Sequence, residues 1–220
     1  MAAGLAAAAE IGTERWRAEV AHYLPLIARV IVQTRRRVLD GEIVPASEKL
    51  VSLFEPHADI IVKGGRQVQY GHKLNLTTGK SGLILDVVIE TGNPADAERF
   101  VSMLDRHIAR TGVPPRQTAA DGGYASRANL AAAKARGVAD VADVAFHKKC
   151  GIAITEMVKS PWVYRRLRNF RAGIEAAISC FKRAYGAARC TWRGLDHFKA
   201  CIWSAVVAHN LVLFARLKPA

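Results

Sequence analysis

Two acidic residues stand in sequence contexts that could build a metal-dependent site, and the first is Asp121. It follows the short run 117–120 and precedes two glycines and Tyr124. A carboxylate at the carboxyl end of a strand lies where α/β folds place ligands, and glycines allow the backbone to turn away sharply. Asp121 could instead only close an Asx-turn within its own loop. The local sequence leaves both interpretations open.

The second acidic residue, Glu175, lies inside a strongly basic helical pattern. Arg171, Ser179 and Lys182 share its side of the helix by their three- and four-residue spacing. A solvent-exposed ion pair with Arg171 is one interpretation, worth roughly a few tenths of a kcal/mol. The other is a metal ligand beside a phosphate-binding surface. The apolar side of this helix is formed by Phe170, Ile174, Ile178 and Phe181.

Two carboxylates from distant parts of a chain are what a magnesium site requires. Mg²⁺ binds few protein carboxylates and fills its remaining positions with water and substrate phosphate. A pair of such ions stabilises the attacking and leaving oxygens of phosphoryl transfer. Water as the nucleophile nicks a DNA strand, whereas a DNA 3′-hydroxyl joins strands. We therefore expect Asp121 and Glu175 to bind Mg²⁺ or Mn²⁺.

The elements that must position these residues begin with a helix and a β-rich section. The spacing of apolar residues predicts a helix over 13–39, divided or kinked at Pro25. Apolar runs follow at 49–54 and 60–62. Residues 68–76 alternate like a half-buried strand, and a glycine-containing turn joins them to an apolar strand at 83–89.

After residue 93 the spacing of apolar residues becomes that of helices, and short strands are predicted between these helices. The predicted strands are 117–120 and 138–146, and the predicted helices are 97–110, 126–136, 160–182 and 195–217. This order indicates an α/β fold in which helices flank a mixed sheet. The triplet Val-Ala-Asp occurs twice in tandem from Val138 to Asp143. A solvent-exposed loop could accommodate the three extra residues of such a repeat. Within a strand, the same three residues would disturb the register.

Composition narrows the class of protein. Half of the 220 residues are hydrophobic, and 32 Lys and Arg against 19 Asp and Glu give a formal charge of +13. Because the basic residues are grouped, a nucleic-acid partner is favoured over a merely solvated basic surface. No G-x-S-x-G motif is present, which disfavours a small hydrolase.

Cysteine usage and the N-terminus predict a cytoplasmic protein. The four cysteines form no C-x-x-C pair and no zinc-ligand spacing with histidine, so we expect reduced thiols. The opening MAAGLAAAAEIG lacks a basic start and is too short to cross a bilayer, so no membrane association is expected.

Several longer stretches resemble the catalytic domain of bacterial insertion-sequence transposases of the acidic-triad (DDE) type, in particular the ISNCY-like group. They are KLVSLFEPHADIIVKG, QYGHKLNL, GNPAD, AADGGYASRANL, SPWVYRRLRNFRAGIEAAISCFKR and AHNLVLFARL. The resemblance implies a ribonuclease H-like fold over residues 45–220, after an N-terminal helical segment at 1–44. It also implies metal-dependent cleavage and strand transfer of double-stranded DNA, at the element ends and the target, with a homodimer as a possible assembly.

The resemblance assigns roles residue by residue. Asp121 and Tyr124 match the family's D-x-x-Y/F motif. Arg171, Glu175 and Lys182 match its R-(three residues)-E-(six residues)-K signature, whose usual preceding Tyr is replaced here by Arg168. The first catalytic and metal-binding Asp is best assigned to Asp59, with Glu55 a poorer choice. The alternative is that the first Asp lies upstream, in sequence that this chain lacks.

Six basic residues are expected to contact DNA phosphates: Arg165, Arg166, Arg168, Arg171, Lys182 and Arg183. Trp192 could stack on a flipped base, although a packed position in the core or loop is the simpler expectation. His72 is expected to be a satisfied, partly buried histidine. No helix-turn-helix unit precedes Lys49. The second hypothesis is therefore a truncated, inactive remnant that binds DNA non-specifically.

Overall fold

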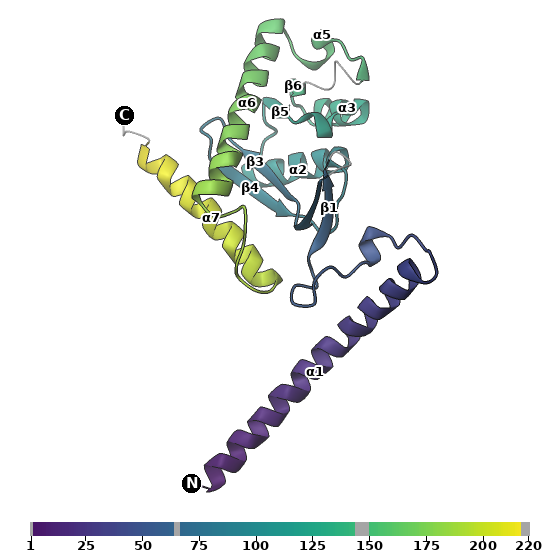
Figure 1. Cartoon of the computed structure of the whole chain (residues 1–220). Coiled ribbons are helices and arrows are strands. Elements are labelled where there is room, and N and C mark those ends of the chain that lie inside the picture. The colour runs from purple at the N-terminus through teal and green to yellow at the C-terminus, as the bar shows by residue number, and fades with distance from the viewer. Residues whose placement is uncertain (1, 64–66, 144–149, 217–220) are drawn as a thin grey trace. The chain divides into compact units, whose positions relative to one another are not determined.

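The chain folds as a mixed α/β protein. The computed structural model describes residues 2–63, 67–143 and 150–216, without the side chains of residues 2–11 and 63. It divides into two compact units (Figure 1). The first unit comprises residues 1–72 and 193–195, and the second comprises residues 73–192 and 196–220. Each unit is described by itself below.

Helix α1 (Ala2–Val38) opens the first unit and continues through Pro25. The expected division into two segments at Pro25 is therefore wrong, because a long helix can forgo the one backbone hydrogen bond that proline cannot donate. The alternative expectation, a kink at Pro25, stays a prediction. Gln33 fixes the following loop to α1. Its side chain donates to the carbonyl of Leu50 at 2.9 Å and accepts from the Leu50 N–H at 2.8 Å. The short 3₁₀ helix η1 (Ala46–Glu48) lies within this loop.

Strands β1 (Asp59–Lys63) and β2 (Gln67–Gly71) form an antiparallel hairpin in the first unit. The apolar run 49–54 belongs to no strand. The reason lies partly at Leu50, whose backbone groups are both satisfied by Gln33 and not by a neighbouring strand. The register pairs Ile60 with Tyr70, so both side chains lie on one face of the hairpin.

In the second unit, β3 (Leu74–Thr78) pairs antiparallel with β4 (Ile84–Ile89), as the turn residues predicted. The single strand expected over 68–76 is instead two strands, which pair with different partners. Gly71 ends β2 with a φ of +143°, a backbone conformation that favours glycine. The alternation of residues in the sequence continues across this break between β2 and β3. The alternation therefore gave no sign that the segment is divided.

The second unit also contains a parallel pair, β5 (Gln117–Ala120) and β6 (Asp140–Asp143), with Ala120 opposite Asp143. Helix α3 (Arg127–Ala135) connects them and begins at Ser126, whose hydroxyl accepts from the Asn129 N–H at 3.0 Å. The predicted strand 138–146 extends into 144–149, outside the described residues. The second Val-Ala-Asp triplet lies inside β6, where Asp140 and Asp143 are both buried.

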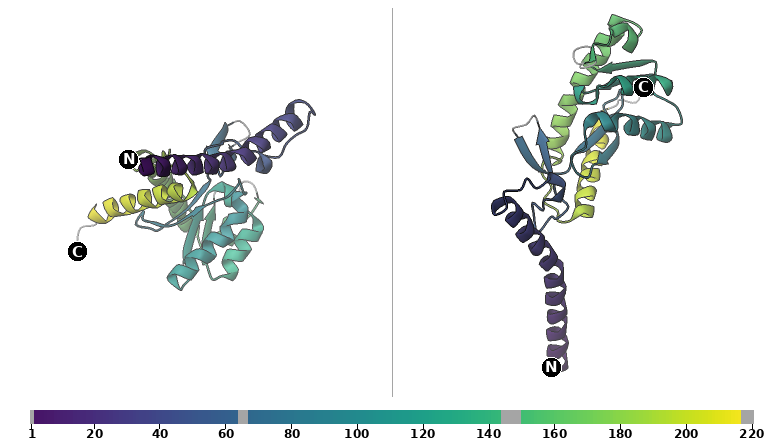
Figure 2. Two further views of the ribbon diagram at one scale, coloured as in Figure 1. Left: turned by 90° about the horizontal axis from the view of Figure 1, so that it is seen from below. Right: turned by 90° about the vertical axis from the view of Figure 1, so that its right-hand side faces the viewer.

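Helices cover these strands around two apolar clusters. One cluster joins α2 (Asp96–Thr111), α3, β6, α5 (Ile154–Met157) and the start of α6 (Pro161–Ala184). The other joins β4, the end of α6 and α7 (Leu195–Arg216), which lie side by side in Figure 2. Helix α5 was not predicted. The described strands form three two-stranded sheets and not one continuous sheet.

Helix α7 is apolar on most of its surface. By length and composition alone it could cross a membrane. One face, however, packs into the second apolar cluster through Ile202, Ala205 and Val206. The other face leaves Trp203, Val207, Leu211 and Phe214 exposed. Helix α7 therefore packs against β4 and α6 by one face only.

Candidate active site

Strand β5 presents Asp121 at its carboxyl end. The residue caps the 3₁₀ turn η2 (Gly122–Tyr124), and its Oδ1 accepts from the Gly122 N–H at 2.6 Å. This contact is the local loop bond that the sequence left open as an alternative. The Asp121 side chain is nevertheless 66% exposed, so the loop bond does not remove the carboxylate from solvent or from a ligand.

Helix α6 presents Glu175. Ser160 begins the helix by accepting from the Val163 N–H at 3.3 Å, with Pro161 in its first turn. The buried side chains Val163, Leu167 and Phe181 fix the rotation of the helix. Glu175 therefore lies on the other side of the helix, and its side chain is 63% exposed.

Arg171 joins the two acidic residues. Its Nη2 lies 2.5 Å from Oε1 of Glu175 and 2.9 Å from Oδ1 of Asp121. The first contact is the i,i+4 ion pair that the helical spacing allowed. The second crosses from α6 to the end of β5. Asp121 and Glu175 are therefore brought to one point, and their contacting oxygens are no farther apart than these two distances combined.

The donor set at this point suits a hard divalent cation. One oxygen of Asp121 and one of Glu175 accept no hydrogen bond within the part of the chain that is described. Carboxylate oxygens on an exposed surface leave room for the waters and phosphate oxygens that Mg²⁺ keeps. The described residues contain no group of three or more His, Cys, Asp or Glu side chains arranged for a metal.

A buried hydrogen-bond network supports the Asp121 loop. Tyr124 donates to Oδ1 of Asn75 at 2.7 Å, and Asn75 donates to Oε1 of Glu90 at 2.6 Å. Burial, together with the charges of Asp96, Asp121 and Glu90, raises the pKa of the Tyr124 hydroxyl above its usual value. Tyr124 therefore remains a donor at neutral pH. Asn75 and Glu90 were not predicted from the sequence. Asn75 is a polar residue within the apolar strand β3, and Glu90 directly follows the apolar strand β4.

Asp96 supports the same loop from the start of α2. A Cβ atom added at Gly123 would lie 2.3 Å from Oδ2 of Asp96, so a side chain there would force Asp96 to move. Lys73 holds Asp96 in place with an ion pair of 2.5 Å and also donates to the Pro94 carbonyl at 2.6 Å. The GNPAD stretch thus packs its acidic residue against the loop that carries Asp121.

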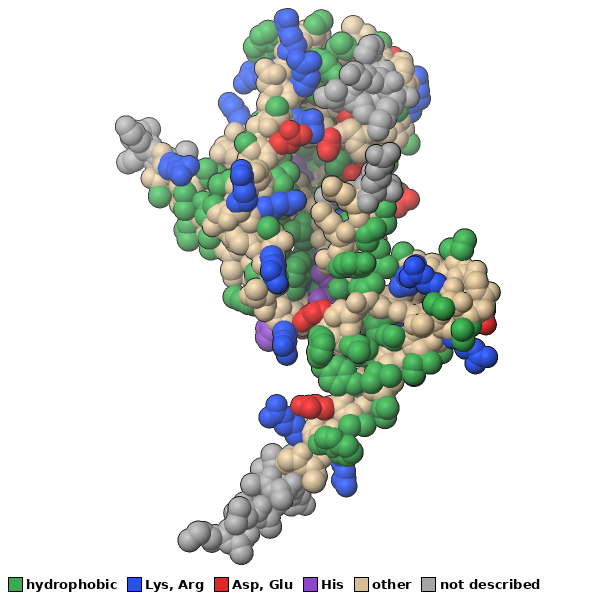
Figure 3. Space-filling model, viewed as in Figure 1, with side chains coloured by type: hydrophobic (Ala, Val, Ile, Leu, Met, Phe, Trp, Pro, Cys, Tyr) green, Lys and Arg blue, Asp and Glu red, His purple; other side chains and the backbone are tan. Residues whose placement is uncertain are grey.

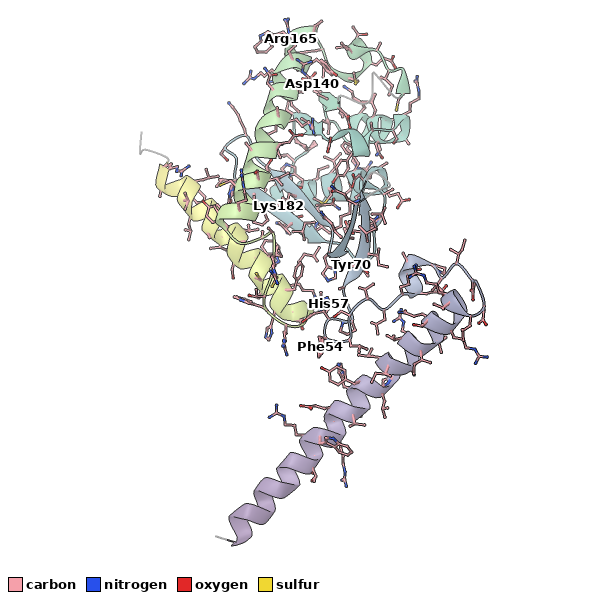
Figure 4. The ribbon with its side chains drawn as sticks, in the orientation of Figure 1. Phe54, His57, Tyr70, Asp140, Arg165 and Lys182 are labelled. Carbon is pink, nitrogen blue, oxygen red and sulfur yellow. The ribbon has the colours of Figure 1, made fainter. Side chains whose placement is uncertain are left out.

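Asp59 belongs to the first unit, where it begins β1. Its Oδ2 lies 3.4 Å from Nδ1 of His72, and Nε2 of His72 lies 2.8 Å from Nδ1 of His57. Glu55 continues this row at 2.7 Å from Nε2 of His57 (labelled in Figure 4). The expectation that His72 is a satisfied, partly buried histidine is confirmed.

The six basic residues expected to contact DNA all lie on α6, and Arg165 and Lys182 mark its two halves (Figure 4). Lys and Arg side chains recur over this helix in Figure 3. Arg168 and Lys182 are each seven residues from Glu175 and share its side of the helix. Arg166 lies on the opposite side, with its guanidinium 5.4 Å from the ring centre of Trp162.

Two further expectations concern Trp192 and the cysteines. Trp192 is 51% exposed, and its N–H lies 3.4 Å from Sγ of Cys190, so it is not a core residue. The four cysteines are free thiols, as expected. Burial and a hydrogen bond to Cys190 raise the pKa of the Cys201 thiol.

Comparison with known proteins identifies a family for most of the chain. Residues 33–211 match the family model described as "Transposase DDE domain". No curated protein and no solved structure matches the chain. The matched range includes both Asp121 and Glu175 as well as the whole of α6.

Proposed function

Because the chain belongs to the transposase DDE domain family, we propose that it cuts and joins DNA strands in a metal-dependent reaction at Asp121 and Glu175. The observation that carries this proposal is the meeting of these two carboxylates at one arginine nitrogen. They come from the end of β5 and the middle of α6, and both side chains are exposed.

Mg²⁺ or Mn²⁺ is the proposed cofactor, held by Asp121 and Glu175. When bound, it would stabilise the charge that develops on a phosphoryl group and on its attacking and leaving oxygens. The chain's own residues hold these carboxylates in place. Tyr124 and Asp96 fix the Asp121 loop, whereas the buried side of α6 fixes Glu175. Asp59 is the proposed third carboxylate of the site.

Double-stranded DNA is the proposed partner, and it would lie along the Glu175 side of α6. Arg165, Arg168, Arg171, Lys182 and Arg183 can face one duplex from this side or its border. We do not extend the proposal to Arg166, because a duplex that contacts Glu175 cannot also reach the far side of the same helix. Contacts of this kind position DNA without reading its sequence.

The finer assignments belong to the same proposal. An antiparallel pair followed by a parallel pair, with the acidic residue after β5, supports a ribonuclease H-like arrangement. The quoted stretches support the ISNCY-like group. Free thiols and the packing of α7 into the second cluster support a cytoplasmic protein, and the exposed apolar side of α7 offers a surface for a homodimer.

Plasmid nicking by the purified chain in Mg²⁺ or Mn²⁺ tests the proposal. We expect Asp121→Asn and Glu175→Gln to abolish nicking, because each removes one of the two carboxylates. Asp196→Asn is the matched control, since its side chain is 94% exposed and pairs only with Lys199 among the residues that the structure describes. Equal nicking by all four proteins would refute the assignment. Absence of nicking by the unchanged chain would instead identify an inactive DNA-binding remnant.

A further inference from the structure

Arg171 occupies an unusual position for a residue expected to hold DNA. A single nitrogen of its guanidinium contacts one oxygen of Asp121 and one of Glu175, at 2.9 and 2.5 Å. Its side chain is 25% exposed, far less than those of the two acids that it joins. The cation therefore lies between the carboxylates and on the inner side of the site, where a shared metal ion would bind.

A guanidinium and a divalent cation cannot both take these oxygens at contact distance. Mg²⁺ binds carboxylate oxygen at about 2.0–2.1 Å and prefers near-octahedral geometry, so an ion that binds the two oxygens contacted by Arg171 requires the guanidinium to leave. The exchange is electrostatically plausible because two carboxylates with one arginine carry a net negative charge. A divalent cation in the same place brings the group, with Arg171 beside it, to a net positive charge.

We infer that Arg171 is a place-holding cation: a divalent ion entering between Asp121 and Glu175 displaces its guanidinium, which then binds a DNA phosphate. This inference rests on the proposed function and adds a coupling to it. Arg171 shares its side of α6 with Arg168 and Lys182. A released guanidinium therefore joins a surface that is already suited to phosphate, and guanidinium binds phosphate in two-pronged geometry.

The coupling must act in both directions. If one ligand changes the protein's affinity for a second ligand, the second ligand changes the affinity for the first by the same factor. In the absence of DNA, Arg171 competes with the metal and weakens its binding. Once DNA phosphate attracts the guanidinium, the carboxylates are available and metal binding strengthens. The site would thus load its metal chiefly when DNA is present.

Mn²⁺ binding to the full chain, measured from the electron paramagnetic resonance signal of free Mn²⁺, tests this inference without any cleavage assay. We expect Arg171→Met to bind Mn²⁺ at least about fivefold more tightly than the unchanged chain when DNA is absent. Arg168→Met is the matched control. It removes the same charge from the same side of α6, yet Arg168 has no hydrogen bond or ion pair within the described residues.

The second half of the experiment measures DNA binding with and without Ca²⁺, by fluorescence anisotropy of a labelled duplex. The unchanged chain should bind DNA more tightly in Ca²⁺, and Arg171→Met should lose most of that gain whereas Arg168→Met keeps it. Arg171→Gln, which keeps a polar side chain, repeats both measurements in case the Met variant does not fold. If Arg171→Met binds Mn²⁺ no more tightly than Arg168→Met, the inference is overturned.

Two further variants separate this outcome from failure of the proposed function. Asp121→Asn and Glu175→Gln should remove the Mn²⁺ site altogether. If Mn²⁺ binds equally well to both of them and to the unchanged chain, no metal is held at this point, and the proposed function and the inference both fail. If these two variants lose the ion but Arg171→Met gains nothing, only the inference fails.

Discussion

The hydroxyl of Tyr124 donates a 2.7 Å hydrogen bond to Oδ1 of Asn75, which lies 49 residues earlier in the chain. Asn75 is 2% exposed, and its side-chain amide donates a hydrogen bond to Glu90. The loop that carries Asp121 is therefore fixed to the β3–β4 pair through a buried amide. Because buried polar groups are costly when left unpaired, this relationship predicts a specific loss of stability.

Tyr124→Phe should lower the free energy of unfolding by about 1–3 kcal/mol, since it leaves Oδ1 of Asn75 buried without its donor. Urea denaturation measures the change. Tyr70→Phe removes the same hydroxyl from a side chain that is 68% exposed, and it should change stability very little. Similar losses in both variants would show that the Tyr124 bond has no special role.

Gly123→Ala should impair both stability and DNA cleavage, because its new Cβ would lie 2.3 Å from Oδ2 of Asp96. Asp96 would have to turn away from Lys73, and the Asp121 loop would lose that support. Gly173→Ala is the opposite case. That position on α6 has open space, so alanine should stabilise the helix by about 0.5–1 kcal/mol. A normal level of nicking by Gly123→Ala would contradict this account of the loop.

Protonation of Asp140 should lower the stability of the protein in acid. Burial opposes ionisation of this residue. Hydrogen bonds from Gln117 and from the Lys159 N–H, together with the charges of Lys134 and Lys159, outweigh it and lower the pKa of Asp140. A lowered pKa contributes stability above the ordinary Asp value of 3.8, and this contribution is lost as pH falls through the folded-state pKa.

Asp140→Asn should therefore flatten the decline in the free energy of unfolding between neutral pH and about pH 3, as measured by urea titrations at each pH. Asp196→Asn alters an exposed carboxylate and should leave the decline unchanged. An equally steep decline in the Asp140 variant would mean that other carboxylates govern acid stability.

DNA affinity should depend on which side of α6 is altered. Arg168→Gln should reduce the slope of log affinity against log salt by about 0.9, the value for one lost phosphate contact. Arg166→Gln should leave this slope nearly unchanged, because Arg166 stacks on Trp162 on the opposite side. The measurement is duplex binding over a range of salt concentrations. Equal effects of the two variants would place the DNA elsewhere.

Local patterns predicted the elements around the site well. The run before Asp121 is β5, and the basic pattern around Glu175 is α6, because spacing and helix-start residues determine both. The division of 68–76 into β2 and β3 could not be predicted. Alternation tells which face a side chain takes, but it does not tell which strand lies alongside.

The site itself was predicted only in part. The Arg171–Glu175 ion pair follows from four-residue spacing, whereas the Arg171–Asp121 contact joins residues from different elements and depends on how α6 packs on β5. The roles of Asn75, Glu90 and Asp96 could not be predicted from their local sequence. Each is polar, and its importance comes only from the partner that the fold places beside it.

The most direct test of the central claim is a change of metal specificity at Asp121 and Glu175. A cysteine thiolate binds Mg²⁺ poorly and binds softer divalent ions better. Asp121→Cys and Glu175→Cys should therefore fail to nick plasmid DNA in Mg²⁺ and should recover activity in Mn²⁺, with Asp196→Cys active in both. Nicking by the two variants in Mg²⁺ at the level of the unchanged chain would contradict a metal site at these carboxylates.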